Sequence, residues 1–146
     1  MSYGSKDLND RRDEALKTAR EHGFTDASVG EDVALFCSEA AELLEDHRDG
    51  QPPTRIWYEE KVPAFHASGE PIMVDGKQAT VIIKHDKQLF VDGKPTRKPA
   101  GIPSEAADII IRVLHFSGKH DIDIEAIVRD KLHYNETRPF RHGKRL

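Results

Sequence analysis

The spacing of apolar residues along the chain changes twice, from a helical period to a strand-like one and back. Two stretches near the N-terminus have helical spacing, from about Leu8 to Glu21 and from about Glu31 to Asp46, and Gly23 follows the first as a helix-ending residue. Two more helices are predicted after the centre of the chain, over about Ser104–Ser117 and about Asp123–Thr137, with Asp123 as an N-cap.

The centre of the chain has a different pattern. Short β-like runs at Ile72–Val74, Thr80–Lys84 and Gln88–Val91 are separated by turn residues. The stretch before them, residues 51–70, shows neither period. We predict a small hairpin or three-stranded meander within an insertion over residues 51–92, which must pack on something because so small a sheet is marginal alone. The predicted organisation is helix–helix, β insertion, helix–helix in one domain over residues 1–146, a mainly all-α fold.

Four carboxylates carry most of the candidate chemistry. Glu39 and Glu42 are three residues apart in the second helix, and Glu105 and Asp108 are three apart in the third, so each pair shares a helical face. Two such helices packed about 8–10 Å apart can aim four oxygen ligands at one point, which suits Mg²⁺. The alternatives are a solvated acidic face for the first pair and an ion pair between Asp108 and Arg112 for the second.

The two carboxylate pairs lie on different kinds of helix. The second helix is amphipathic, with Glu39, Glu42 and Asp46 on the side opposite its apolar residues. That apolar side consists of Val33, Phe36, Cys37, Ala40 and Leu44. The third helix is apolar around most of its circumference, through Ala106, Ile109, Ile110, Val113, Leu114 and Phe116. It is therefore predicted to be largely buried, so that its carboxylates need partners.

The fourth helix adds a positive charge. Lys131 and Asn135 are four residues apart on the side that also carries Ile124 and Val128. The lysine can extend along this apolar face to reach water, or it can contact a phosphate at the mouth of a site. Taken singly, the first reading is the simpler one.

Composition narrows the classes of function. The 146 residues carry a formal net charge of −4, which argues against general affinity for nucleic acid or anionic membranes. A single cysteine, Cys37, permits no internal disulfide and favours a reducing compartment. The chain contains no apolar run of membrane-spanning length and no signal-peptide pattern, so a cytoplasmic location is predicted. The histidines form no zinc-ligand spacing.

Three segments together resemble the MazG-like nucleotide pyrophosphohydrolases of the all-α NTP pyrophosphatase superfamily. The segment Ser38–Leu44 (SEAAELL) resembles the ExxE helix of that family, and Gly101–Arg112 (GIPSEAADIIIR) resembles its ExxD helix. The segment Lys131–Lys144 (KLHYNETRPFRHGK) is similar to its closing signature. The two acidic motifs are farther apart here than in compact members of the family, and the resemblance assigns nothing to residues 51–92.

The resemblance implies a four-helix bundle-type MazG-like fold, completed by assembly into a homodimer or homotetramer. It also implies Mg²⁺-dependent hydrolysis of a nucleoside triphosphate between the α and β phosphates, to a monophosphate and pyrophosphate, with Mn²⁺ as a substitute metal. By position it makes Glu39, Glu42, Glu105 and Asp108 metal ligands, with Glu42 or Glu39 as the catalytic base. The implied substrate contacts are Lys131, Asn135, Arg138, His142 and Lys144.

Two alternatives remain open. The first alternative is a non-catalytic helical interaction or regulatory module that keeps the fold. The second is a related pyrophosphohydrolase that acts on a phosphoribosyl nucleotide. Substrate profiling separates the two enzymes. Thermal unfolding with and without Mg²⁺ tests the non-catalytic alternative, because a ligand that binds only the folded state raises the unfolding temperature.

Overall fold

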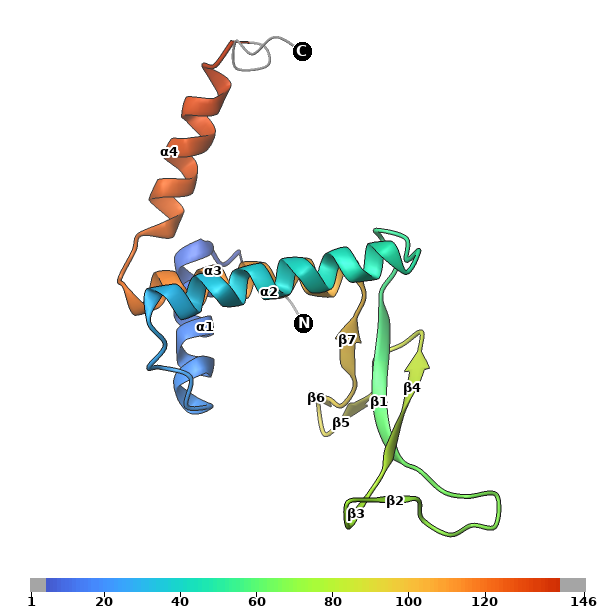
Figure 1. Ribbon diagram of the computed structural model, residues 1–146. Coiled ribbons are helices and arrows are strands. Elements are labelled where there is room, and N and C mark those ends of the chain that lie inside the picture. The colour runs from blue at the N-terminus through green and yellow to red at the C-terminus, as the bar shows by residue number, and fades with distance from the viewer. Residues whose placement is uncertain (1–4, 140–146) are drawn as a thin grey trace. The chain divides into compact units, whose positions relative to one another are not determined.

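The computed structural model describes residues 5–139, which form four helices and seven short strands (Figure 1). The helices are α1 (Leu8–Glu21), α2 (Val29–Arg48), α3 (Ile102–Lys119) and α4 (Ile124–Glu136). The strands are β1 (Trp57–Pro63), β2 (Met73–Val74), β3 (Lys77–Gln78), β4 (Thr80–His85), β5 (Phe90–Val91), β6 (Lys94–Pro95) and β7 (Lys98–Ala100). The chain divides into two compact units, Met1–Ser38 with Asp108–Leu146, and Glu39–Ala107. Both boundaries fall inside a helix, α2 or α3.

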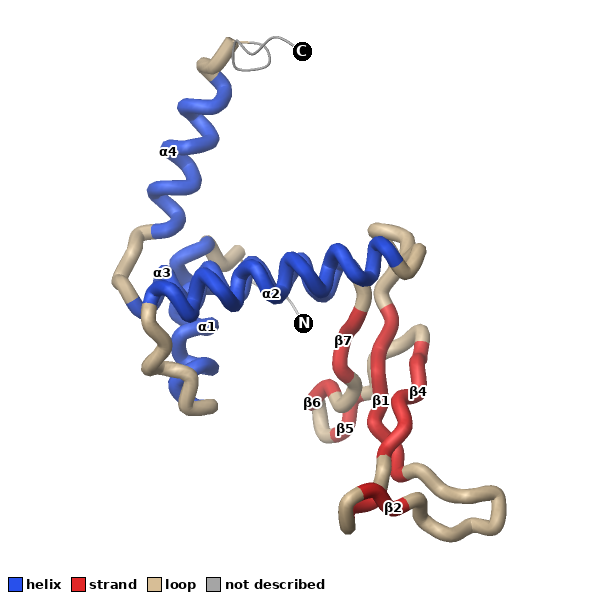
Figure 2. The backbone as a smooth tube through the Cα atoms, in the orientation of Figure 1, coloured by secondary structure: helices blue, strands red, loops and turns tan. Residues whose placement is uncertain are grey.

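The prediction of a mainly all-α four-helix bundle is wrong. The chain is 48% helical and about 19% strand, and its antiparallel three-stranded sheet makes it an α+β fold. All the strands lie between α2 and α3 along the chain (Figure 2). Periodicity failed at the central strand, β1, because charged residues such as Glu59, Glu60 and Lys61 occupy both of its faces and hide the two-residue alternation.

The four helices lie where their sequence patterns predict. α1 has the predicted bounds, and Gly23 follows it with a φ of 79°. Asp123 caps α4, since its carboxylate accepts a hydrogen bond from the Ala126 N–H at 3.0 Å. α2 and α3 each extend two residues beyond the predicted limits at both ends. The earlier start of α2 follows from a capping box in which Ser28 and Glu31 hydrogen-bond each other's backbone N–H groups.

Polar contacts join α1 to the start of α4 within the first unit. The Asn9 side chain donates to the Asp123 carboxylate at 2.8 Å, and the Leu8 N–H donates to the Glu125 carboxylate at 3.2 Å. α1 also packs closely on the end of α3. A Cβ added at Gly118 would lie 3.0 Å from the Leu16 Cβ, which is closer than most Cβ contacts, so the glycine permits this close approach.

Both α2 and α3 bury polar residues and expose apolar ones, so a fully solvated acidic face on α2 is excluded at Glu39. Asp32 and Glu39 are buried on α2, whereas Val33 and Leu44 from its predicted apolar side are exposed. On α3 the buried residues include Glu105 and His115, while Ile110 and Ile111 are exposed. The prediction that α3 is largely buried therefore fails along this stripe. An edge-to-face contact between Phe36 and Phe116, with ring centroids 5.8 Å apart, is the aromatic part of the packing.

In the second unit β1 is the central strand and pairs antiparallel with β4 on one side and β7 on the other, in the order β4-β1-β7. Two small hairpins, β2–β3 and β5–β6, extend from this sheet. Their turns are the Asp-Gly pairs at 75–76 and 92–93, with φ values of 49° and 77° and of 50° and 73°. Positive φ at both central residues is the geometry of a type I′ hairpin turn.

Few large apolar side chains are buried among the described residues. The buried apolar residues are Trp57, Ala64, Ala100 and Leu114. None of the helices within residues 5–139 is long and apolar enough to cross a membrane.

Candidate metal centre

Three of the four predicted metal ligands lie together. Glu39 on α2 and Glu105 and Asp108 on α3 each offer a carboxylate oxygen, and these oxygens all lie within 4.8 Å of one another. Glu39 is 8% exposed and Glu105 is 7% exposed. Asp108 is half-buried. Two helices far apart in sequence therefore direct acidic side chains toward one point.

The start of α3 is held in place by a close contact with the sheet. Gly101 precedes the helix with a φ of 101°, and a Cβ added there would lie 2.7 Å from the Trp57 ring and 2.6 Å from the Arg55 carbonyl oxygen. Only glycine fits this conformation and this space. Glu105 follows in the first turn, where the N-terminal end of the helix dipole favours a carboxylate.

The fourth predicted ligand, Glu42, is exposed on α2, one helical turn beyond Glu39. It does not belong to the group of three. The structure thus brings together one carboxylate from the first acidic motif and both from the second.

The donor set fits a hard divalent cation. Carboxylate oxygens suit Mg²⁺ and Mn²⁺. Mg²⁺ holds its oxygens at about 2.0–2.1 Å, so opposite ligands in its octahedral shell lie about 4.2 Å apart. The 4.8 Å limit on the three oxygens is only slightly wider than this. Side-chain torsions can close the difference, and waters would complete the shell.

Of the predicted substrate contacts, Lys131 and Asn135 lie on α4 and Arg138 follows its end. All three side chains are exposed. The Lys131 ammonium lies 5.7 Å and the Arg138 guanidinium 5.8 Å from the centroid of the Tyr134 ring. His142 and Lys144 lie outside the described residues.

A second buried polar cluster was not predicted. The Lys119 ammonium lies 2.7 Å from the Asp32 carboxylate and donates to the Ala27 carbonyl oxygen at 2.6 Å. Asp32 is 3% exposed. The sequence contains one signal for this cluster. Asp32 and Glu39 are seven residues apart, so they lie on the same face of α2.

His115 belongs to this cluster. It is buried, and its ring hydrogen-bonds the backbone of Phe24. Burial lowers the pKa of His115, and the nearby negative charge of Asp32 opposes that shift. Among the described residues the Nε2 atom has no hydrogen-bond partner. Burial therefore favours the neutral form of the ring.

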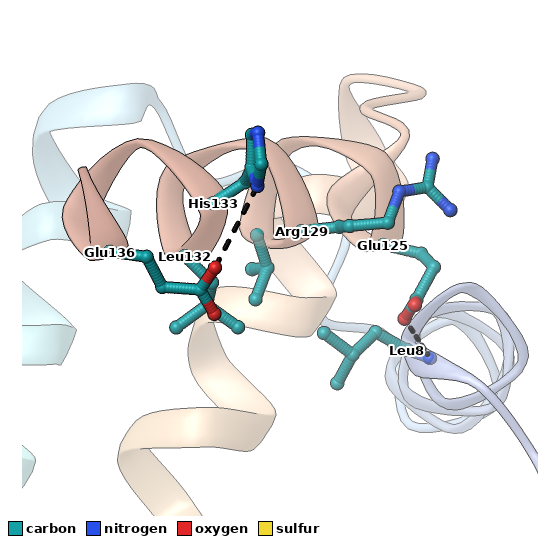
Figure 3. A pocket seen from close by; sticks show the side chains of 7 residues that line it. Leu8, Glu125, Arg129, Leu132, His133 and Glu136 are labelled. Carbon is teal, nitrogen blue, oxygen red and sulfur yellow. Dashed lines mark hydrogen bonds and ion pairs between the residues drawn. The ribbon is translucent and has the colours of Figure 1, made fainter.

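An open cleft of about 530 Å³ lies along α4 beside the start of α1 (Figure 3). It is lined by Leu8, Glu125, Val128, Arg129, Leu132, His133 and Glu136. None of the predicted site residues within the described range lines it. We therefore place the candidate site at the carboxylates and not at this cleft.

Comparisons with known proteins identify no relative. No protein-family model matches the chain. Searches of the curated proteins and of the solved structures found no match either. The chemistry of the site must therefore be argued from its own residues.

Proposed function

We propose that this protein is a Mg²⁺-dependent nucleoside triphosphate pyrophosphohydrolase, which cleaves between the α and β phosphates to give a monophosphate and pyrophosphate. One observation carries the proposal. Three of the four acidic residues that the motifs single out, Glu39, Glu105 and Asp108, have carboxylate oxygens within 4.8 Å of one another, although Glu39 is distant in sequence from the other two. Acids three apart are common on helices, but convergence of two such motifs is not expected of surface decoration.

In this proposal the three carboxylates hold the metal ion beside the triphosphate. When bound, Mg²⁺ supplies a Lewis acid that polarises phosphoryl oxygens. The helices fix the carboxylates before substrate arrives, so that little reorganisation accompanies binding.

Glu42 is assigned the role of base, with Glu39 as the alternative. Glu42 is exposed and is not one of the three converging groups, so its carboxylate is available to take a proton from water. The water oxygen attacks the α phosphorus, the bond from that phosphorus to the bridging oxygen breaks, and pyrophosphate leaves. Lys131, Asn135 and Arg138 are the proposed phosphate contacts, on the strength of the motif similarity alone.

Substrate profiling tests the proposal. The purified chain is incubated with each nucleoside triphosphate, and separately with a phosphoribosyl nucleotide, in Mg²⁺ or Mn²⁺, and pyrophosphate and monophosphate are assayed. We expect both products, in equal amounts, from at least one nucleoside triphosphate. Turnover of the phosphoribosyl nucleotide alone would assign the related activity instead. No turnover of any substrate with either metal would overturn the enzymatic proposal.

We further propose that the chain works as a homodimer or homotetramer. The support is the exposed apolar side of α2, which includes Val33, Cys37 and Leu44. An apolar stripe at helical spacing is normally covered by another element. The mass of the particle in solution tests this.

A further inference from the structure

The two edges of the sheet are unlike. The three-stranded sheet ends at β4 on one side and at β7 on the other. β7 is a three-residue strand with a proline, Pro99, at its centre. β4 has six residues and contains neither proline nor glycine. Because an uncovered edge strand is a template for pairing with another chain, this difference is informative.

The position of Pro99 in β7 establishes which backbone groups of β4 face outward. Opposed residues in an antiparallel ladder alternate between hydrogen-bonded and non-hydrogen-bonded pairs. Pro99 lies opposite Tyr58 and has no N–H, and its carbonyl oxygen accepts a hydrogen bond from the Ser104 hydroxyl. That pair is therefore the non-hydrogen-bonded kind, and Tyr58 directs its backbone groups to β4, where it lies opposite His85.

The alternation then continues along β4. His85, Ile83 and Val81 direct their N–H and C=O groups toward β1, and the residues between them direct theirs away. A hydrogen bond of 2.8 Å from the Ala64 N–H to the Ala79 carbonyl oxygen, one step beyond the strand end, follows the same alternation. The outward-facing residues are Thr80, Ile82 and Lys84. On β7 the only outward position is Pro99, so that edge is blocked.

The β4 edge is also apolar on both faces of the sheet. Val81, Ile82 and Ile83 are 49%, 54% and 43% exposed. β-Branched residues in succession favour pairing in a sheet, and an uncovered edge of this composition is a hazard that proteins normally protect. The β4 edge is therefore suited to pairing with another strand.

We propose that β4 pairs antiparallel with β4 of a second copy of this chain. With Ile82 opposite the partner's Ile82, each strand donates the N–H groups of its three outward residues and accepts at their three carbonyl oxygens. Thr80 then lies opposite the partner's Lys84, so no lysine faces a lysine. On the other face of the sheet, Val81 lies opposite the partner's Ile83, which is a favourable cross-strand pair.

This register is the one that pairs all three outward residues of β4 with β4 residues of the partner. A shift of two residues in either direction leaves one outward residue of each strand without a β4 residue opposite it. A two-fold axis through Ile82 makes the contact isologous. The joined sheet has the order β7-β1-β4-β4-β1-β7 and ends at Pro99 on both sides, so pairing stops at two copies.

The first test is a charge at the two-fold axis. Ile82→Glu places like charges opposite each other, and we expect the mass in solution, measured by sedimentation or light scattering, to fall to half that of the wild type. The matched control is Met73→Glu, because Met73 is also 54% exposed but lies on β2. We expect this control to keep the wild-type mass. Circular dichroism establishes that both variants fold. A monomeric wild type, or an Ile82→Glu variant of unchanged mass, would overturn the proposal.

The second test uses disulfide cross-linking to determine the register of the two β4 strands, and its expected result is the gain of a bond. In a Cys37→Ser background, Ile82→Cys places two sulfur-bearing residues across the axis with Cα atoms about 5.5 Å apart, within the disulfide range of about 4.4–6.8 Å. Lys84→Cys places them four residues out of register, about 13 Å apart. Mild oxidation should therefore cross-link the first variant and not the second. Equal cross-linking of both, or none at position 82, would contradict the proposed pairing.

Discussion

Two clusters of polar side chains lie on α2 and α3, and they differ in the residues that they bring together. At one, Asp32 is matched by Lys119, and the pair sums to no net charge. At the other, Glu39, Glu105 and Asp108 gather three acidic groups within 4.8 Å. The Asp32–Lys119 pair joins a carboxylate to a cation of the chain and contributes to the structure. Three carboxylates that meet at one point also offer oxygen ligands of the kind that a divalent cation takes.

The largest expected effect is a loss of activity when the carboxylate cluster is changed. Glu105→Gln removes a proposed ligand, and we expect the pyrophosphohydrolase rate to fall by more than the roughly 10–100-fold typical of residues that only support a ligand. Glu45→Gln is the matched control, since Glu45 is an exposed acid of α2 outside both clusters, and it should retain the rate. Equal rates for the two variants would remove Glu105 from the site.

At the Asp32–Lys119 pair we expect a loss of stability without a loss of activity. Lys119→Met leaves Asp32 buried without its cation, and breaking a buried pair on one side costs about 3–5 kcal/mol. Urea unfolding should show this loss, whereas kcat of the folded protein should stay close to that of the wild type. The double change Asp32→Asn with Lys119→Met should recover part of the stability. A variant as stable as the wild type would show that the pair contributes little.

The change in thermal stability on addition of Mg²⁺ should depend on the carboxylate cluster and not on the Asp32–Lys119 pair. A ligand at about 100 times its Kd raises the free energy of unfolding by about 2.7 kcal/mol if it binds only the folded state. We expect thermal unfolding to shift upward with Mg²⁺ in the wild type and in Lys119→Met, and to stay unchanged in Glu105→Gln. A shift of the same size in Glu105→Gln would place the metal elsewhere.

The smallest expected effect is a pH dependence from the matched cluster. The pKa of His115 is lowered from about 6.5 because the ring is buried, so the unfolded chain takes up a proton at a higher pH than the folded one. Stability should therefore decline as the pH falls below about 6.5, down to the lowered pKa. Urea unfolding at several pH values should show a flatter profile for His115→Gln over that window. Identical profiles would mean that His115 does not contribute.

The helices were predictable from sequence because each has a local signal. The bounds of α1 and the Asp123 cap of α4 follow from residues within one or two turns. The sheet was not predictable in the same way. β1 lacks a visible two-residue alternation, and its neighbour β7 consists of three residues including Pro99, so their pairing depends on contacts remote in sequence.

The site was predictable in part. The two motifs identify the carboxylates, and the structure brings Glu39, Glu105 and Asp108 together while leaving Glu42 exposed. The helical wheel of α2 left two interpretations of its acidic side open, a solvated face and a set of ligands, because it does not show which side meets another helix. Here Asp32 and Glu39 face inward, since each meets a polar or acidic group of α3. A wheel built from one helix carries no information about the partner helix.

Direct titration with a divalent cation tests the central claim most directly. Mn²⁺ binding is followed by electron paramagnetic resonance or calorimetry, with Mg²⁺ as competitor, in the wild type, Glu105→Gln and the control Glu45→Gln. The account predicts saturable binding in the wild type and in the control, displaced by Mg²⁺, and its loss in Glu105→Gln. Equal Mn²⁺ affinity in all three proteins, or no binding to the wild type, would contradict it.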